Sequence, residues 1–566
     1  MKSSRPERGR ALRAAPESKS VLPLWTRFHA RRARLPKPTP WRMRTVRIPT
    51  RANLLLGADL YTPVTPSKGV LVAFGPYGRG APLSIGFARA FAGQGYTVLF
   101  VSSRGTADSE GDLDPIRTDA EDYQDIVAWL REQLWYPGRF GTIGSSYLGY
   151  TQWALMSDPP PDLAAAVVTM GPHDFSRHVW GSGSFRFDIL EWSADVGAPD
   201  DPNPLRGWRT RSVTRKRVGG VVAGVPLLPA AEEFFTAAGR AWVLDRLRRD
   251  DIGDPFWAPE QHTDALDISD VPTLIFAGWQ DVFLSQSVRQ YARLRERGAD
   301  VALTVGAWTH IDILLRGQPV IGPETLDWLD THLADRDTRR RRAPVRVQVG
   351  AEQRWLELSE WPPAGAFTTL HLHPDRRLTA EPPGPDAAPA SFLFDPARPT
   401  PTIGGNLLNR GGYRDDTAYA ERDDVLVYDS EPLQEELRLL GAPSVLLTHS
   451  SERRDADVFV RVSDVDRRGR SRAVTETYRR WQGTGPLALT LNDSAYLFRA
   501  GHRVRLIVAG GSFPQFSRNP GTGENPLTAA VLHPNRHHIQ HANGASVLRL
   551  PNAEHSQRNI RAHRAD

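Results

Sequence analysis

The sequence predicts an α/β protein with an inserted helical segment and a second, strand-rich domain. Apolar strands alternate with amphipathic helices over the first part of the chain, and short strands separated by Gly, Pro and Asp follow to the C-terminus. Apolar strands that alternate with helices form a mostly parallel sheet covered on both faces. The length of 566 residues also exceeds what one hydrophobic core usually organises, so more than one domain is expected.

The α/β part is expected over residues 46–171 and 268–340. It begins with two hairpin-like strands and continues through six apolar strands, most of them followed by helical spacing. These segments are VRIP, LLGADLY, GVLVAF, YTVLFV, FGTI, AAAVVTM, TLIFAG and VALTVG. Between 172 and 267 the alternation stops, and aromatic, charged stretches predict a helical cap. From 341 to 566, regular short strands predict a β-sandwich or jelly roll.

Residues 1–45 stand apart as a basic arm. Residues 1–47 hold 14 Lys and Arg against two Glu, a net charge of +12, so the rest of the chain carries −6. A basic arm can bind polyanions, and an Arg-rich, acid-poor start also resembles a transit peptide. Its Pro, Arg and Ser content favours a solvated, disordered extension. We therefore expect no nucleic-acid partner.

Composition also restricts location and chemistry. No apolar run approaches the roughly 20 residues of a membrane span, and the N-terminus lacks the apolar stretch of a secretory signal. We therefore expect a soluble, cytoplasmic protein without a membrane partner, and a homo-oligomer is compatible with the sequence. The absence of Cys excludes disulfides, thiolate nucleophiles and cysteine zinc sites. The candidate catalytic groups are thus Ser, Thr, carboxylates and His.

The stretch GTIGSSYLG is the most informative motif, because it lies between a predicted strand and a predicted helix. A Ser at such a sharp junction is presented as a nucleophile in strained φ/ψ, which requires a small residue two positions earlier. Gly144 meets this requirement for Ser146, whereas Ser145 would place Ile143 there. The downstream glycine, Gly149, comes later than in the usual G-x-S-x-G pattern.

Partners for Ser146 follow two later strands. A serine hydroxyl needs a base, and a neutral His oriented by a buried carboxylate serves best. Asp281 follows TLIFAG, and His310 follows VALTVG. Because the carboxyl ends of parallel strands share one edge of a sheet, these residues are predicted to converge as a triad in the order Ser, acid, His. Each residue also has an ordinary structural alternative. Ser146 can belong to a plain turn, Asp281 can be the N-cap of a helix from Phe283 onward, and His310 can cap a helix or pack without catalysing.

Acyl transfer also needs hydrogen-bond donors for the oxyanion. The backbone N–H of Tyr147 is the default first donor. The second usually comes from the loop after an early strand, here FGPYGRG, where Tyr77 is the notable polar group. The Tyr77 phenol is therefore a candidate donor, although it can instead pack on the cap.

The remaining histidines are not assigned to catalysis. His173 also follows a strand but precedes the acid in the chain, so we place it at the cap hinge. His332 lies in an amphipathic helical segment. Four more histidines cluster near the C-terminus: His533, His537, His538 and His541. Because no carboxylate or Cys accompanies them at ligand spacing, an exposed loop is predicted rather than a metal site.

Several motifs follow one another from about Val46 to the C-terminal strands: GPYG, SSRGTADSEG, GTIGSSYLGYTQW, GWQDVF, GAWTH and GHRVRLIVAGGSFPQFSRNPGTG. This set resembles the cocaine-esterase-like branch (CocE/NonD hydrolases) of the α/β-hydrolases, grouped with Xaa-Pro dipeptidyl-peptidases and α-amino-acid ester hydrolases. The resemblance implies an α/β-hydrolase core, an inserted cap, a C-terminal jelly roll and no cofactor or metal. It also implies a Tyr hydroxyl in the oxyanion hole, which fits Tyr77, and an aromatic acyl pocket formed by Trp180, Trp192 and Phe283.

The sequence departs from this family in one loop. Members often have an Asp before the RG of the second motif, where this chain has Ser102 and Ser103. Because that Asp is not a triad member, the change concerns loop structure more than chemistry. The basic arm lies outside the resemblance.

The predicted function is hydrolysis of a small-molecule carboxylic ester through an acyl-enzyme on Ser146. An Xaa-Pro dipeptidyl-peptidase or α-amino-acid ester hydrolase, acting on an amide or amino ester, is the alternative. Such an enzyme needs carboxylates for the substrate ammonium, and Asp174, Asp188 and Glu191 of the cap are candidates. A catalytically inactive binding protein is a third alternative, against which an intact triad argues.

Overall fold

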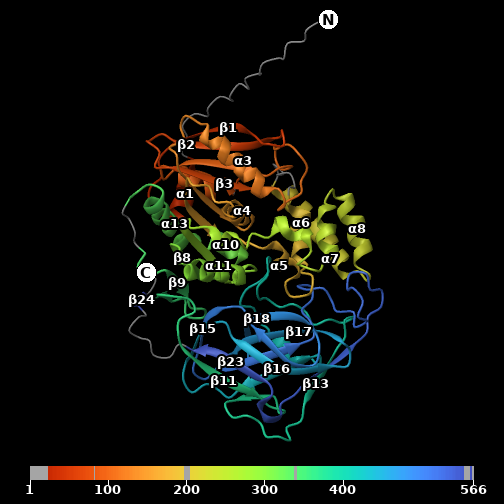
Figure 1. Cartoon of the computed structure of the whole chain (residues 1–566). Coiled ribbons are helices and arrows are strands. Elements are labelled where there is room, and N and C mark those ends of the chain that lie inside the picture. The colour runs from red at the N-terminus through yellow and green to blue at the C-terminus, as the bar shows by residue number, and fades with distance from the viewer. Residues whose placement is uncertain (1–22, 82, 197–203, 337–340, 553–560, 564–566) are drawn as a thin grey trace.

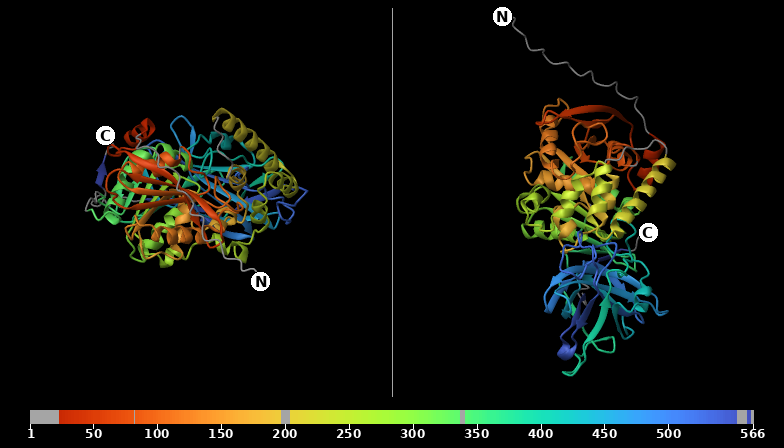
Figure 2. Two further views of the ribbon diagram at one scale, coloured as in Figure 1. Left: turned by 90° about the horizontal axis from the view of Figure 1, so that it is seen from above. Right: turned by 90° about the vertical axis from the view of Figure 1, so that its right-hand side faces the viewer.

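The computed structural model describes residues 23–81, 83–196, 204–336, 341–552 and 561–563 of the chain. These residues form an α/β core, a helical cap at its side and a β-rich domain beneath it (Figure 1). Figure 2 shows in side view that the core and the β-rich domain stack along the long dimension of the molecule. The predicted α/β class and the strand-rich C-terminal domain are therefore confirmed.

A mostly parallel sheet forms the centre of the core. In the described part of the chain it has eleven strands in the order β1-β2-β4-β3-β5-β6-β7-β8-β9-β10-β24. Neighbours from β4 through β3 to β9 pair parallel, whereas the strands at both ends pair antiparallel. The bounds are β1 Trp41–Pro49, β2 Leu55–Pro63, β3 Val70–Gly75, β4 Thr97–Ser102, β5 Phe140–Ser145, β6 Leu163–Thr169, β7 Thr273–Gln280, β8 Val301–Thr309, β9 Val345–Gln348, β10 Trp355–Leu358 and β24 Arg561–His563.

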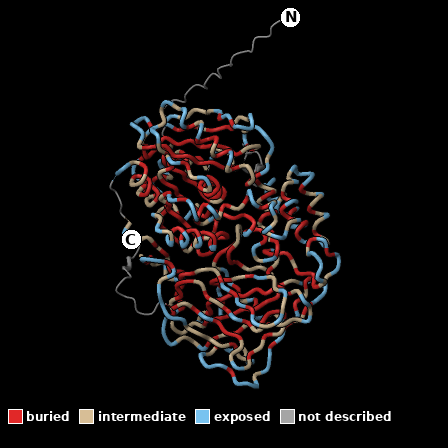
Figure 3. Tube along the Cα trace, viewed as in Figure 1, coloured by how far each residue is buried: buried red, intermediate tan, exposed pale blue. Residues whose placement is uncertain are grey.

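Helices cover both faces of this sheet. Strands such as β3, β5 and β7 are therefore buried along their whole length (Figure 3). One face packs against α3, α4 and α11, and the other packs against α1, α2 and α13. The bounds are α1 Leu24–Arg32, π-helix η1 Ser84–Arg89, α2 Ala90–Ala92, α3 Asp119–Arg131, α4 Tyr147–Met156, α11 Leu284–Glu296, α12 His310–Leu315 and α13 Gln318–His332.

Part of the predicted disordered arm is ordered, which corrects the prediction made for residues 1–45. Helix α1 buries Thr26 and Ala30, and the first strand begins at Trp41 and pairs with Pro63. The structural reason is the spacing of small buried residues in α1, which the many Arg residues obscured in the sequence. Residues 1–22 lie outside the described part of the chain.

The cap forms between β6 and β7, where the alternation of strands and helices stops. It comprises α5 Phe175–Trp180, α6 Asp188–Asp195, α7 Pro204–Ala223, α8 Leu228–Ala237, α9 Trp242–Arg248, η2 Pro255–Glu260 and α10 Ala265–Ile268. Its apolar side chains share one buried cluster with Tyr147 and Tyr150 of α4, so the cap lies directly over that helix. None of the helices in the described residues combines the length and apolar character that a membrane crossing requires.

The C-terminal domain encloses a separate apolar core between its strands. Two of the strands expected in it from residue 341, β9 and β10, join the core sheet instead. The domain's own strands are β11 Ala366–Leu372, β12 Arg377–Thr379, β13 Ala390–Phe394, β14 Val425–Ser430, β15 Leu437–Gly441, β16 Ser444–Ser451, β17 Asp455–Val465, β18 Ser471–Gln482, β19 Gly485–Thr490, β20 Ser494–Phe498, β21 Arg503–Ala509, β22 Asn535–Ile539 and β23 Val547–Asn552, with short helices η3 Thr417–Glu421 and η4 Ala542–Gly544.

Candidate active site

Ser146 lies at the turn between β5 and α4. Its φ of 57° and ψ of −121° place a non-glycine residue in the left-handed half of φ/ψ space, the strain expected of a nucleophile held at such a turn. The backbone N–H of Ser146 donates to the carbonyl of Thr169 at 2.8 Å, which ties the turn to β6. The side chain is thus projected beyond the carboxyl ends of the strands.

Two glycines permit this turn for different reasons. A Cβ on Gly144 would lie 2.4 Å from Cβ of Leu148, so the turn itself excludes a side chain there. A Cβ on Gly149 would lie 2.7 Å from Cα of Gly171, in the segment that follows β6. Gly149 therefore serves the close approach of α4 to the sheet, which explains why it need not follow the usual spacing from the Ser.

The structure brings Ser146, His310 and Asp281 together from the ends of β5, β8 and β7. Nε2 of His310 lies 3.0 Å from Oγ of Ser146, and Nδ1 lies 2.6 Å from Oδ1 of Asp281. Asp281 is fully buried, so its carboxylate is shielded from water and directed at the imidazole. With Nδ1–H donating to Asp281, Nε2 is free to accept the Ser146 proton.

The loop that carries Asp281 is held from both sides. Oδ2 of Asp281 accepts the N–H of Phe283 at 3.2 Å, which closes the turn before α11; the N-cap of that helix is Phe283 itself, so Asp281 does not have the alternative role of helix cap. Nδ2 of Asn406, from the C-terminal domain, donates to the carbonyls of Trp279 at 3.0 Å and Asp281 at 2.9 Å. Sequence reasoning missed Asn406, because nothing near it in the chain points to a contact with a loop about 125 residues earlier.

The Tyr77 hydroxyl faces the Ser146 hydroxyl. The Tyr77 hydroxyl lies within hydrogen-bonding reach of the Ser146 side chain and of the Tyr147 backbone amide, and burial raises the pKa of Tyr77 so that it stays protonated. The indole N–H of Trp192 donates to the Tyr77 hydroxyl at 3.1 Å. Because an indole can only donate, this bond occupies a lone pair of the phenol and leaves its proton for the Ser146 side.

Replacement of Tyr77 by Phe is expected to lower kcat about 10²- to 10³-fold and to change KM little, since the candidate oxyanion donor is lost. The measurement is steady-state hydrolysis of p-nitrophenyl acetate. Tyr150→Phe is the matched control, because the Tyr150 hydroxyl bonds to the carbonyl of Ile116 at 3.0 Å and to His262. Equal losses in both variants would argue against a specific role for Tyr77.

The Tyr147 side chain is anchored beneath the site. Its hydroxyl donates to the carboxylate of Asp119, and its ring stacks on Trp192 with centroids 5.9 Å apart. Burial raises the pKa of Asp119 to about 7. These contacts fix the backbone amide of Tyr147 relative to Ser146. Asp119 was not predicted, because an acid in the first turn of a helix resembles an ordinary helix-start residue.

Ser146 opens onto a narrow cavity of about 30 Å³ between core and cap. Trp192 and Phe283 lie in its wall, but Trp180 does not, which corrects its assignment to the pocket. Trp180 is buried in the cap and donates its indole N–H to the carbonyl of Arg246 at 2.9 Å. It follows Phe175 by five residues, about 140° around the helix, and α5 lines the cavity with Phe175 and His178 instead.

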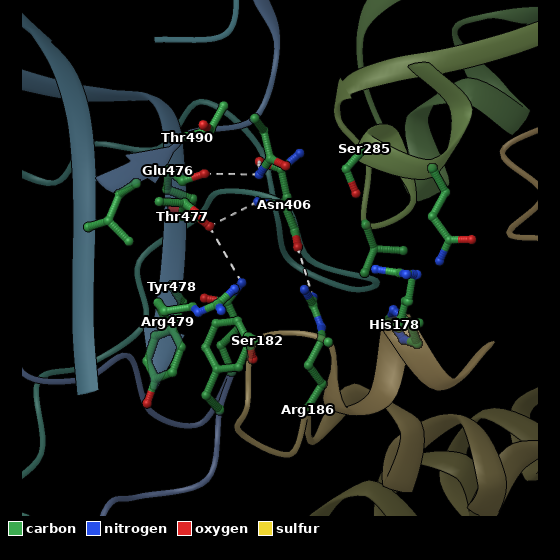
Figure 4. A pocket seen from close by; sticks show the side chains of 18 of the residues that line it. His178, Ser182, Arg186, Ser285, Asn406, Glu476, Thr477, Tyr478, Arg479 and Thr490 are labelled. Atoms are coloured by element: carbon green, nitrogen blue, oxygen red, sulfur yellow. Dashed lines mark hydrogen bonds between the residues drawn. The ribbon is translucent and has the colours of Figure 1, made fainter. Parts of the chain in front are cut away.

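A larger cavity of about 500 Å³ lies beside the catalytic one and shares His178 with it (Figure 4). None of the three triad side chains lines it. Nη2 of Arg186 donates to the carbonyl of Asn406 at 3.1 Å and to the carboxylate of Asp188 at 3.2 Å. The cap, the catalytic acid loop and the C-terminal domain therefore meet around this cavity.

The other histidines have structural surroundings. His173 is buried at the cap hinge, where its carbonyl accepts the N–H of His262 at 2.7 Å, and burial lowers its pKa to about 3. His537 and His541 are buried as well, which corrects the predicted exposed loop: His537 stacks on Phe392, and His541 bonds to the Tyr428 hydroxyl at 3.0 Å. The described residues contain no group of three or more potential ligands that could hold a metal ion.

Two family models match the chain. Residues 53–312 match the X-Pro dipeptidyl-peptidase (S15 family), and residues 339–548 match the X-Pro dipeptidyl-peptidase C-terminal non-catalytic domain. The chain is 28% identical over 533 residues to cocaine esterase from Rhodococcus sp. (strain MB1 Bresler). The aligned region covers 84% of this chain and 92% of the relative. Helix α1 precedes the first matched region.

Two solved structures have the same fold. An aminopeptidase from the marine sediment archaeon Thaumarchaeota archaeon has a TM-score of 0.77 at 20% identity and covers 91% of this chain and 96% of its own. An α-amino acid ester hydrolase has a TM-score of 0.76 at 22% identity and covers 90% of this chain and 96% of its own. At such identities the likeness concerns the fold.

Proposed function

Because the chain belongs to the serine hydrolases that include the S15-family X-Pro dipeptidyl-peptidases and cocaine esterase, we propose that it hydrolyses carboxylic esters with Ser146 as nucleophile. The observation that carries this proposal is the hydrogen-bonded chain from Ser146 through His310 to Asp281 at the mouth of an apolar cavity. Tyr77 and the Tyr147 amide complete the site as oxyanion donors.

The proposed reaction has two steps. Nε2 of His310 accepts the Ser146 proton as Oγ attacks the ester carbonyl, and the resulting oxyanion accepts hydrogen bonds from Tyr77 and the Tyr147 amide. Asp281 stabilises the imidazolium. The imidazolium then protonates the departing alkoxide, which leaves as an alcohol and yields an acyl-enzyme. Water repeats the sequence, releasing the carboxylic acid and restoring the Ser146 hydroxyl.

The charges around the cavity favour an ester over a substrate with a free amine. Of the three cap carboxylates considered, Asp188 lines the catalytic cavity, whereas Asp174 caps α5 and accepts the N–H of Arg177 at 3.1 Å. Although burial opposes ionisation, Arg186 and His178 hold the pKa of Asp188 well below its usual range. Arg186 donates to Oδ2 of Asp188 at 3.2 Å, so the negative charge of this carboxylate is already compensated within the protein and attracts a substrate ammonium less strongly.

The remaining candidate, Glu191, accepts a hydrogen bond from Nδ2 of Asn409 at 3.4 Å and is not part of the cavity wall. The runner-up function is an Xaa-Pro dipeptidyl-peptidase, which the S15-family match favours. It requires an ammonium site close to the acyl carbon attacked by Ser146. The arrangement of Asp174, Asp188 and Glu191 supports the ester function instead.

The proposal is tested by comparing kcat/KM for p-nitrophenyl acetate and butyrate with kcat/KM for alanyl-proline p-nitroanilide. Ester turnover well above amide turnover is expected. Titration with a fluorophosphonate first establishes the fraction of active sites, so that a weak signal cannot be attributed to inactive protein. Robust cleavage of the anilide with negligible ester hydrolysis would replace the esterase proposal with the peptidase.

A further inference from the structure

A third cavity lies on the other side of the catalytic turn. It has a volume of about 330 Å³ and is enclosed by α1, η1, α12 and the sheet. Ser145 lines this cavity and Ser146 lines the catalytic one, and the two cavities have no lining residue in common. The backbone of the turn therefore separates them, so a ligand in one does not occupy the other.

The interior of this cavity is apolar. It is lined by Phe87 of η1, Leu314 of α12, Ile143 of β5 and Val167 of β6. These side chains belong to or pack against the buried cluster on this face of the sheet. The cavity is thus a gap in that core that reaches the surface beneath α1.

Large apolar side chains form its rim. Trp25 is 69% exposed and Phe28 59% on α1, and Ile311 is 44% exposed and Leu315 52% on α12. The Trp25 and Phe28 rings contact each other with centroids 6.2 Å apart. Exposed apolar side chains gathered around an apolar cavity mark a surface that binds another molecule.

The charge at this rim is positive. Arg32 lines the cavity, and its Nη2 donates to the carbonyl of Leu315 at 3.1 Å, which joins α1 to α12. Helix α1 contains no acidic residue, and residues 23–58 hold nine Lys and Arg without an Asp or Glu. His29 also lines the cavity, but burial and the Arg32 charge lower its pKa. Arg32 is therefore the permanent charge at the mouth.

We propose that this cavity binds a long-chain carboxylate, with the hydrocarbon chain among Phe87, Ile143 and Val167 and the carboxylate at Arg32. A mostly apolar cavity of a few hundred Å³ with a few polar groups at its mouth is the usual composition of a small-molecule site. The chain would cover the exposed rim, and the anionic head would meet the cation. Binding uses none of the three triad side chains, so the proposal stands apart from the esterase function.

The test is a fluorescence titration of the full-length protein with cis-parinarate, an 18-carbon fatty acid whose emission rises in apolar surroundings. Ser146 is first blocked with a fluorophosphonate, so that the probe cannot bind as a substrate in the catalytic cavity. Saturable binding of one equivalent to the blocked protein is expected. Absence of saturable binding would overturn the proposal.

Gly86 offers a variant that fills the cavity. It lines the cavity, and a Cβ built on it meets no atom within 4 Å, so Gly86→Phe places its ring in open space. We expect parinarate affinity to fall about tenfold or more in Gly86→Phe, a change of about 1.4 kcal/mol. Gly220→Phe on α7 is the matched control, since its Cβ also meets no atom within 4 Å. An unchanged rate of fluorophosphonate labelling shows that each variant is folded.

The carboxylate contact is tested separately. Arg32→Gln is expected to weaken displacement of parinarate by decanoic acid about threefold and to leave displacement by decan-1-ol unchanged, because an exposed charge contributes little. Equal affinity in Gly86→Phe and wild type would place the probe elsewhere and refute the site. A protein that sediments with phosphatidylglycerol vesicles but shows no saturable parinarate binding would instead use α1 to dock on a membrane surface. That result would equally refute the proposed carboxylate site.

Discussion

Replacement of Ser146 by Ala is expected to lower kcat/KM for p-nitrophenyl acetate by about 10⁴-fold or more, because the oxygen that forms the acyl-enzyme is removed. Covalent labelling by a fluorophosphonate is expected to disappear at the same time. The residual rate would come from the oxyanion donors and the cavity, which the substitution leaves in place. Thermal unfolding of the variant should stay close to that of wild type, since the hydrogen-bond partners of Oγ among the described residues, His310 and Tyr77, belong to the same site.

Ser145→Ala is the matched control for this prediction. Ser145 is the neighbouring serine that could be mistaken for the nucleophile, but it is buried and lines the cavity behind the turn. Activity and labelling should therefore stay within a few-fold of wild type. Loss of labelling in Ser145→Ala with retention in Ser146→Ala would reverse the assignment. Retention in both would place the nucleophile elsewhere.

Asp281→Asn is expected to lower kcat about 10⁴-fold with little loss of stability. In the wild type, Oδ1 accepts the Nδ1–H of His310, which leaves Nε2 as the base for Ser146. The amide of Asn can present its N–H₂ to Nδ1 instead. The ring then carries its proton on Nε2 and cannot accept the Ser146 proton. The measurement is kcat for p-nitrophenyl acetate together with the pH dependence of kcat/KM.

Asp312→Asn, two residues after His310, is the matched control for Asp281→Asn. Asp312 accepts the Thr309 hydroxyl at 3.0 Å and does not contact the triad. We expect Asp312→Asn to keep activity within a few-fold of wild type. If both variants lost activity alike, the effect of Asp281→Asn would be ascribed to disturbance of the loop and α12 rather than to the imidazole tautomer.

The convergence of Ser146, Asp281 and His310 could be predicted because each residue directly follows an apolar strand. Parallel strands end at one edge of a sheet, so position in the chain determines the neighbourhood in space. The exact side-chain directions could not be predicted in the same way. Trp180 illustrates this limit, because its short helix turns it into the cap core and directs Phe175 to the cavity.

Contacts between domains were beyond sequence reasoning. Asn406 reaches the carbonyl of Asp281 from the C-terminal domain, and the Trp192 indole of the cap donates to the Tyr77 hydroxyl. Both pairs join residues more than 100 positions apart, and neither side of the contact has a local pattern. Many distant pairs of polar groups have equally suitable chemistry, so the sequence does not select the pair that forms.

The chain of 566 residues by itself determined the α/β class, the strand-rich C-terminal domain and the catalytic candidates, because hydrophobic periodicity and strand-end motifs are local signals. Only the tertiary structure decided what surrounds Ser146: the reason for Gly149, the orientation of Tyr77 and the bracing of Asp281. It also decided that α1 forms beside the cavity behind the turn at Ser146. Such features depend on side chains that meet after the chain has folded, and their energies come from packing and desolvation that no short stretch of sequence contains.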